Sequence, residues 1–298
     1  MRLALVLAIL FSAMTYQGKA RPAFAGGATT WQPIQSPTLN NLFDVTLFSS
    51  TEGWAVGDNG TILQFNGTSW SVVDTSLLTS NNLHGIAFDS ATDGWAVGES
   101  GTILHFSNSS WATVANPASS TDILTGVSTV SSTDAWAVSS PNGKIFNFNG
   151  TNWVLSQTST SGFLQAIAMV SSNDGWIVGP NLGSGPVLLR FDGTTWNAVT
   201  LPTTVAAAVA NEDFYSVTID PSGNPWIVGS DQTLLHFDGT NWTVSVTSGG
   251  PALLSASLDS ATDGWATGSG SSILHFDGST WSVVASPTGS IGFIPLYS

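Results

Sequence analysis

Two tryptophans recur at fixed places in a repeated segment, and this feature constrains the fold more than any other. The best copy spans residues 53–76 and reads GWAVGDNGTILQFNGTSWSVVDTS. Six copies follow one another with a period of about 40 residues. The first tryptophan of each copy is Trp54, Trp95, Trp136, Trp176, Trp226 or Trp265, and the second is Trp70, Trp111, Trp153, Trp196, Trp242 or Trp281. With Trp31, a further copy of the second, these account for all 13 tryptophans.

Each copy consists of short apolar runs separated by turn signals. Asp58-Asn59-Gly60 separates the first run from the second, and Asn66-Gly67 separates the second from the third. Asn-Gly tolerates positive φ at both central positions of a tight hairpin, so these runs are predicted to be paired strands. A further strand of small, alternating residues precedes each first tryptophan, as in residues 44–48. Four short strands per unit at this period are typical of a β-propeller blade.

We therefore predict an all-β fold of six four-stranded blades, formed by residues 26–298 as a single domain. The segment around Trp31 resembles the outer strand of a blade, and residues 291–296 resemble an inner strand. We expect these spare strands to close the ring, because closure removes exposed sheet edges. The alternative is seven blades, the last an incomplete closing blade built from the two ends.

Residues 1–25 have the features of a secretory signal peptide. Arg2 precedes an apolar run over residues 3–14, and Ala23-Phe24-Ala25 is a small-x-small cleavage site. We expect cleavage before Gly26 and a secreted or extracytoplasmic protein, with a retained anchor as the alternative. No later segment is apolar over a bilayer-spanning length, so we expect no membrane insertion after cleavage.

Composition limits the partners and the chemistry. The predicted mature chain carries only Lys144 and Arg190 against 19 acids, so nucleic acid and anionic membrane surfaces should repel it. Basic partners or cations should be attracted instead. The absence of cysteine excludes thiolate nucleophiles, thiolate metal sites and disulfides. The core must therefore rest on apolar burial, to which large tryptophan side chains contribute most. We expect a monomer without cofactors.

The segment GWAVGDNGTIL at residues 53–63 resembles the repeats of the photosystem II stability/assembly factor family, within the BNR/Asp-box-type propellers. Residues 191–196 and 237–242 are similar to shortened Asp-box hairpins. The resemblance covers about residues 41–287. It implies an assembly factor that holds other proteins through a basic surface patch, for which this chain keeps only Lys144 and Arg190. Asp-box propellers include sialidases, which grip a carboxylate with three arginines, so a single arginine in the mature chain excludes that activity.

Most acids fall at repeated turn positions, where aspartate accepts backbone N–H bonds. A turn role explains many copies, whereas glycoside hydrolysis needs only one carboxylate pair, so we predict no catalytic residue. The acids least explained by the repeat are Asp74, Asp122, Glu212 and Asp213.

Three of the four histidines share one position, before the phenylalanine of the third strand. They are His105, His236 and His275, and the other copies place Gln64, Asn147 and Arg190 there. Equivalent residues of different blades are spread around a ring, which argues against a metal site. We expect these side chains to form hydrogen bonds between blades.

Insertions in the fourth copy and in the connector that follows it are candidate binding-face loops, with a tolerated surface loop as the alternative. Their candidate residues are Asn181, Leu182, Ser184, Glu212 and Asp213. We predict a secreted, non-catalytic propeller that binds a protein partner as an assembly scaffold. The alternative is a multivalent, lectin-like propeller that binds glycans through its tryptophans. A glycan hydrolase or lyase using Glu212 and Asp213 is a third hypothesis.

Overall fold

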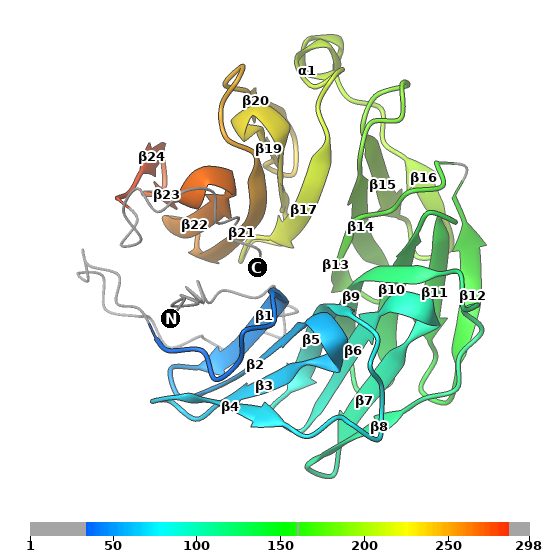
Figure 1. The fold of residues 1–298 in the computed structure, drawn as a ribbon. Coiled ribbons are helices and arrows are strands. Elements are labelled where there is room, and N and C mark those ends of the chain that lie inside the picture. The colour runs from blue at the N-terminus through cyan, green and yellow to red at the C-terminus, as the bar shows by residue number, and fades with distance from the viewer. Residues whose placement is uncertain (1–33, 160, 286–298) are drawn as a thin grey trace.

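The computed structural model describes residues 34–159 and 161–285. They form six four-stranded antiparallel sheets arranged in a ring, each sheet built from four consecutive strands (Figure 1). The predicted six blades are thus confirmed. The predicted signal peptide, the Trp31 segment and residues 291–296 lie outside the described residues.

The blades follow one another along the chain. The first is β1 (Leu42–Ser49), β2 (Glu52–Gly57), β3 (Ile62–Phe65) and β4 (Trp70–Val73). The second is β5 (Leu83–Ser90), β6 (Asp93–Gly98), β7 (Ile103–Ser107) and β8 (Ser110–Thr113). The third is β9 (Ile123–Ser131), β10 (Asp134–Ser140), β11 (Lys144–Phe148) and β12 (Trp153–Thr158). The fourth is β13 (Ala166–Ser171), β14 (Asp174–Gly179), β15 (Val187–Phe191) and β16 (Trp196–Ala198). The fifth is β17 (Phe214–Ile219), β18 (Pro225–Gly229), β19 (Leu234–Phe237) and β20 (Trp242–Ser245). The sixth is β21 (Leu253–Ser260), β22 (Asp263–Gly268), β23 (Ser272–Phe276) and β24 (Trp281–Val283). A short helix, α1 (Thr203–Ala208), lies in the connector between the fourth and fifth blades.

The tryptophans form the joints between blades. The first tryptophan of one blade meets the second tryptophan of the next blade edge to face, the arrangement that the ring quadrupole favours. Trp54 and Trp111 are centred 5.6 Å apart at 82°, and Trp95 and Trp153 are 5.1 Å apart at 89°. The same joint is made by Trp136 with Trp196, Trp176 with Trp242, and Trp226 with Trp281.

Burial agrees with this role. Nine of the twelve repeat tryptophans are buried, and Trp242, Trp265 and Trp281 are half-buried. The second strands of the second and fourth blades are buried along almost their whole length, because a neighbouring blade covers each face of the sheet. The predicted tryptophan core is therefore confirmed.

The turn after each second strand explains the recurring glycine. In the first blade Asn59 has φ 55° and Gly60 has φ 69°, both left-handed. A Cβ on Gly60 would collide with the carbonyl oxygen of Thr79, so the connector to the next blade packs directly on this turn. Gln232 and Ser271 adopt the same positive φ at the equivalent positions of the fifth and sixth blades, so glycine is required at residue 60 chiefly for space.

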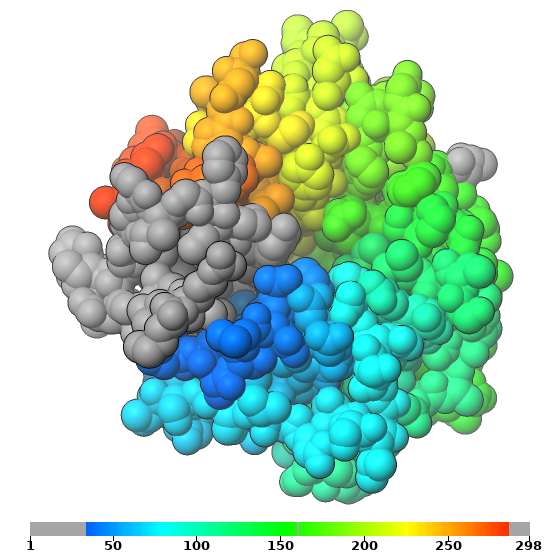
Figure 2. Space-filling model, viewed as in Figure 1, coloured from blue at the N-terminus to red at the C-terminus, as the bar shows by residue number. Residues whose placement is uncertain are grey.

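The inner strands line a central channel. β1 packs on β5, β5 on β9, β9 on β13, β13 on β17 and β17 on β21. The space-filling view shows consecutive blades in direct contact, from the blue first blade to the yellow fifth (Figure 2). Within the described ranges, no helix has the length and apolar character needed to cross a bilayer.

Candidate binding face and central channel

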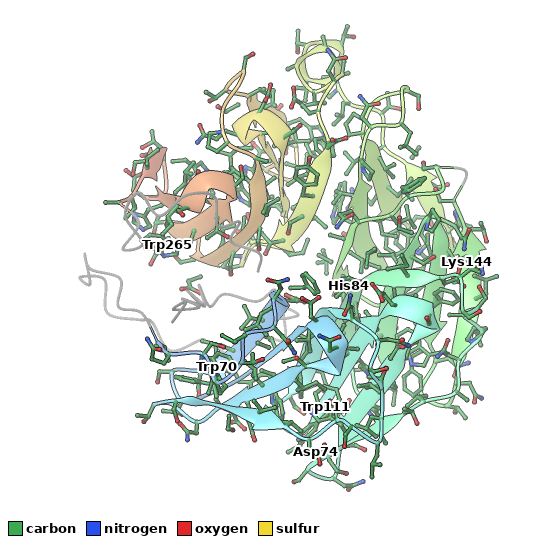
Figure 3. The ribbon with its side chains drawn as sticks, in the orientation of Figure 1. Trp70, Asp74, His84, Trp111, Lys144 and Trp265 are labelled. Atoms are coloured by element: carbon green, nitrogen blue, oxygen red, sulfur yellow. The ribbon has the colours of Figure 1, made fainter. Side chains whose placement is uncertain are left out.

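The central channel contains a cavity of about 380 Å³, to which the inner segments of all six blades contribute. We call its mouth the ring of one equivalent position per blade, the residue that follows the leucine or phenylalanine at the start of each inner segment. These residues are Phe43, His84, Thr125, Gln165, Tyr215 and Leu254. They differ from blade to blade, whereas the tryptophan and turn positions repeat. In Figure 3 His84 lies close to the centre of the ring, while Trp70 and Trp111 lie further out.

One residue deeper in the channel, five blades carry small side chains. They are Gly85, Gly126, Ala166, Ser216 and Ser255. The wall is crowded here, since a Cβ on Gly85 would lie 3.2 Å from the Cα of Gly126. The first blade carries Asp44 at this position instead.

Asp44 connects two blades and has a perturbed carboxyl group. Its Oδ1 accepts the Val45 N–H at 2.8 Å, and its Oδ2 accepts the Ile86 N–H of the next inner strand at 2.7 Å. Burial raises its pKa to about 7, against the opposing effect of the two backbone N–H donors. Sequence reasoning missed Asp44, although the six inner strands in register would have shown one acid among five small residues.

Two further titratable side chains lie at the mouth. The His84 ring is centred 5.1 Å from that of Phe43, and its Nε2 lies 3.6 Å from Glu99 Oε1. Burial lowers the pKa of His84, although Glu99 acts in the opposite direction, so the neutral imidazole dominates at pH 7. The Tyr215 hydroxyl donates to Asp213 Oδ2 at 3.3 Å, which joins the mouth to the insertion beyond the fourth blade.

The structure brings three of the five predicted binding-face residues into one cluster. Asn181 donates its backbone N–H to Asp213 Oδ1 at 2.8 Å, and its side-chain amide donates to the Ala210 carbonyl at 2.7 Å. Glu212 is buried and accepts the Ser230 hydroxyl at 2.6 Å. Glu212 and Asp213 thus hold two loops together beside the mouth.

The other two predicted residues belong to the same loop but present their side chains to solvent. Leu182 is 55% exposed, and Ser184 is also exposed. Whether these loops form the binding face stays a prediction.

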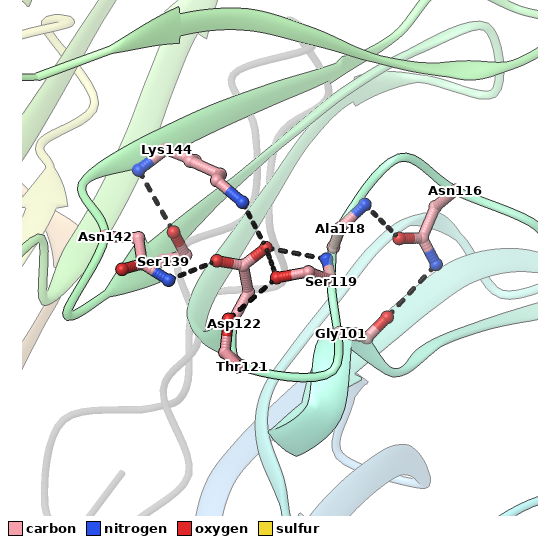
Figure 4. Close-up of polar contacts among 9 residues, drawn as sticks. All are labelled: Gly101, Asn116, Ala118, Ser119, Thr121, Asp122, Ser139, Asn142 and Lys144. Atoms are coloured by element: carbon pink, nitrogen blue, oxygen red, sulfur yellow. Dashed lines mark hydrogen bonds and ion pairs between the residues drawn. The ribbon is translucent and has the colours of Figure 1, made fainter.

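Asp122, an acid that the repeat did not explain, is the centre of a buried polar network (Figure 4). Its carboxylate accepts Lys144 Nζ, Asn142 Nδ2 and the Ser119 N–H, each at 2.7 Å, and the Ser119 hydroxyl at 2.9 Å. Burial alone would raise its pKa, but these bonds, led by that from Lys144, lower it to about 2. Asp74, another such acid, caps a turn by accepting the Ser76 N–H at 3.0 Å.

The shared histidine position forms its bonds within one blade, so the predicted hydrogen bonds between blades are wrong. His105 pairs in register with Trp95, stacks on its ring at 4.0 Å, and lies 3.1 Å from Asp93 of the same blade. The antiparallel register places His105 of β7 opposite Trp95 of β6. It thereby brings His105 near Asp93, the acid at which β6 begins. His275 lies 2.8 Å from Asp263 in the same way.

The fourth and fifth blades differ from this arrangement. Arg190 forms two hydrogen bonds to Asp174, at 2.9 and 3.0 Å, and its guanidinium lies 4.9 Å from the centre of the Trp176 ring. In the fifth blade Asn224 replaces the acid, and His236 lies 3.5 Å from Asp220 instead. Among residues 34–159 and 161–285, no group of three His, Asp or Glu side chains is placed to hold a metal ion.

The acids of the outer hairpins have the predicted turn role. In the fourth blade Asp192 accepts the N–H groups of Thr194 and Thr195, both at 2.9 Å. Asp238 and Asp277 do the same in the fifth and sixth blades. Hydrogen bonds from the turn lower the pKa of all three carboxyls, so their charge serves the local fold.

Comparisons with known proteins agree with this architecture. Residues 25–137 match the model of the family described as "Photosynthesis system II assembly factor YCF48". No curated protein sequence matches the chain. The solved structure "YCF48 bound to D1 peptide" is similar with a TM-score of 0.67 and 18% identity, over 91% of this chain and 88% of that one.

Two other structures share the fold. YCF48 from Cyanidioschyzon merolae has a TM-score of 0.61 and 16% identity, over 84% of this chain and 87% of its own. A catalytically inactive virginiamycin B lyase from Staphylococcus aureus with quinupristin has a TM-score of 0.68 and 12% identity, over 88% of this chain and 94% of its own. Residues 25–137 thus resemble the repeats of that family, and the described residues share the β-propeller fold of these solved structures.

Proposed function

We propose that this protein is a secreted, monomeric, non-catalytic propeller that binds a polypeptide partner and acts as an assembly scaffold. Its binding face is the rim that carries the channel mouth and the Asn181–Asp213 contact. This proposal also places the protein outside the cytoplasm after loss of residues 1–25, which N-terminal sequencing of the exported protein tests. A mature chain that begins at Gly26 is the expected result.

One observation carries the binding face. Positions that the fold dictates keep the same residue type from blade to blade, as the tryptophans and turn acids do. The six mouth positions are structurally equivalent, yet they hold two aromatic residues, a histidine, a threonine, a glutamine and a leucine. The fold does not require this variety, and such unlike side chains around one opening suit recognition of an asymmetric ligand. A likeness to a propeller solved with a peptide supports a polypeptide as that ligand.

The test is affinity capture from the extracytoplasmic fraction of the source cells, followed by mass spectrometry. A mouth variant combines His84→Ala, Gln165→Ala and Tyr215→Ala, and the matched control is Val72→Ala on an exposed outer strand. A polypeptide that binds the wild type and the control but not the mouth variant is the expected result. Equal capture by all three proteins would contradict the proposal that the mouth binds the partner.

The glycan-binding alternative has a separate test. Its tryptophan faces are engaged in the joints between blades, so a sugar site would have to use the rim. Saturable binding on a glycan array, with no mouth-dependent polypeptide, would favour it. For the hydrolase or lyase hypothesis, turnover abolished in a Glu212→Gln, Asp213→Asn double variant would favour catalysis.

A further inference from the structure

Asp44 is a channel acid with a pKa of about 7, and its ionised form has no basic partner among the described residues. Among the described residues that line the cavity, Asp44 is the single acid and there is neither lysine nor arginine. The basic side chains of the described ranges, Lys144 and Arg190, bind Asp122 and Asp174 elsewhere. His84 is the one histidine in the described lining, but burial favours its neutral form. A cation from outside would therefore gain from entering.

The geometry of the carboxylate selects among cations. A divalent metal ion takes six or more oxygen ligands, several of them carboxylates, whereas this lining offers one carboxylate. A guanidinium binds best as a fork to both oxygens, and a backbone N–H already occupies one lone pair on each oxygen of Asp44, which restricts the directions left for a fork. A primary ammonium is a compact point charge with three donors, and one free lone pair of the carboxylate satisfies one of them.

The surroundings suit the rest of an alkylammonium group. Ser216 and Ser255 line the cavity at the positions equivalent to Asp44, so the described wall carries hydroxyl groups as well as the carboxylate. Phe43 and Tyr215 line the mouth, and aromatic faces attract ammonium cations and cover alkyl chains. The volume of about 380 Å³ lies within the range of small-ligand pockets.

We propose that the channel binds an alkylammonium group through Asp44, with the lysine side chain or amino terminus of the polypeptide partner as its source. This inference rests on the proposed function, because it supplies the chemistry by which the partner is recognised. A free alkylamine carries the same group, so the experiment separates the two sources.

The first arm uses n-butylammonium as the probe, titrated calorimetrically into the full-length mature protein. n-Butanol is the uncharged comparison, and n-butylguanidinium is the comparison whose donors form a planar fork. The variants are Asp44→Asn and Asp44→Ser, the latter placing in the first blade the residue of the fifth and sixth. Asp74→Asn is the matched control, because it removes one charge from an exposed turn, far from the channel in Figure 3.

The expected result is saturable binding of n-butylammonium, weakened about tenfold or more in both Asp44 variants and unchanged in the control. n-Butanol and n-butylguanidinium should bind more weakly than n-butylammonium. Near-ultraviolet circular dichroism confirms that each variant is folded. A folded wild type that does not bind n-butylammonium, or an Asp44→Ser variant that binds it equally, overturns the inference.

The second arm separates this inference from the proposed function. A captured polypeptide that binds wild type and Asp44→Ser equally leaves the proposed function standing and overturns the channel as the amine site for that partner. A partner that binds only the wild type, and is lost when its amines are acetylated, supports both. Binding of n-butylammonium without any mouth-dependent polypeptide overturns the proposed function and assigns the channel to free amines.

Discussion

Asp44 in the channel and Asp122 on the rim are both withdrawn from water, yet folding moves their pKa values in opposite directions. Asp122 accepts four hydrogen bonds, one from Lys144, and its pKa falls to about 2. Asp44 accepts two backbone N–H groups, and its pKa rises to about 7. Burial penalises both charges, so the partners decide the sign. The comparison separates an acid whose bonding is complete within the fold from one that retains capacity for a ligand.

The largest expected effect comes from breaking the rim network. Asp122→Asn removes the charge that holds Lys144 and replaces an acceptor by a donor facing Asn142 and Ser119. We expect the free energy of unfolding at pH 7 to fall by about 3 kcal/mol. Urea unfolding followed by tryptophan fluorescence measures it, with Asp74→Asn as the control. A loss no larger than that of the control would contradict the stabilising role of the network.

The stability that Asp44 contributes should depend on pH in the opposite direction. Because folding raises the pKa of Asp44 from 3.8 to about 7, its contribution to stability is fully present below pH 4 and is lost as the pH rises through 7. The wild type should therefore lose stability relative to Asp44→Asn between pH 4 and pH 8, on the order of 4 kcal/mol.

Urea unfolding across this pH range measures that difference. His84 lines the same mouth and titrates in both proteins, and the raised pKa of Tyr215 keeps it neutral across this range, so the difference between the two curves isolates Asp44. Parallel curves would mean that Asp44 keeps an ordinary pKa and that the contrast with Asp122 fails.

A smaller change sharpens the contrast by removing one neutral donor. Asn142→Ala deletes a 2.7 Å hydrogen bond to Asp122 but leaves Lys144 in place. We expect a loss of about 1 kcal/mol at pH 7. The stability that Asp122 contributes is present above pH 4 and lost as the pH falls through about 2, so weaker bonding should move that acid loss to higher pH. An unchanged acid midpoint would show that Lys144 and Ser119 set the pKa without Asn142.

The smallest effect is expected at an exposed turn acid. Asp277 accepts the N–H groups of Ser279 and Thr280, and Asn66 and Asn149 make the same bonds in other blades. Asp277→Asn should therefore shift the melting temperature by no more than about one degree. A larger shift in calorimetry would show that charge, and not only the acceptor oxygen, matters at this turn.

The repeat made the architecture predictable, since one local pattern occurs six times and each copy requires the same burial. Trp54 and Trp111 could be assigned to the core because every blade supplies their equivalents. The partner of His105 was mistaken because the pattern identifies equivalent positions but not the antiparallel register that brings Asp93 to the ring.

The candidate site was harder to predict because its residues break the repeat. Asp44 belongs to a strand otherwise described by small residues, and Glu212 and Asp213 are joined to Asn181 and Ser230 only by tertiary contacts. A residue-by-residue comparison of the six copies finds such departures. Their bonding partners and pKa shifts require coordinates.

The edge-to-face tryptophan joints have a consequence for how the molecule is made. Each joint needs one indole from each of two successive repeats, so a single repeat leaving a ribosome or a membrane pore cannot bury either ring in this way. The first joint forms when a second repeat has been made. Each later repeat then adds one more joint and its contribution to stability. A truncated product should therefore hold together through its earlier repeats and fray at its most recent one, which suits a chain that emerges in order.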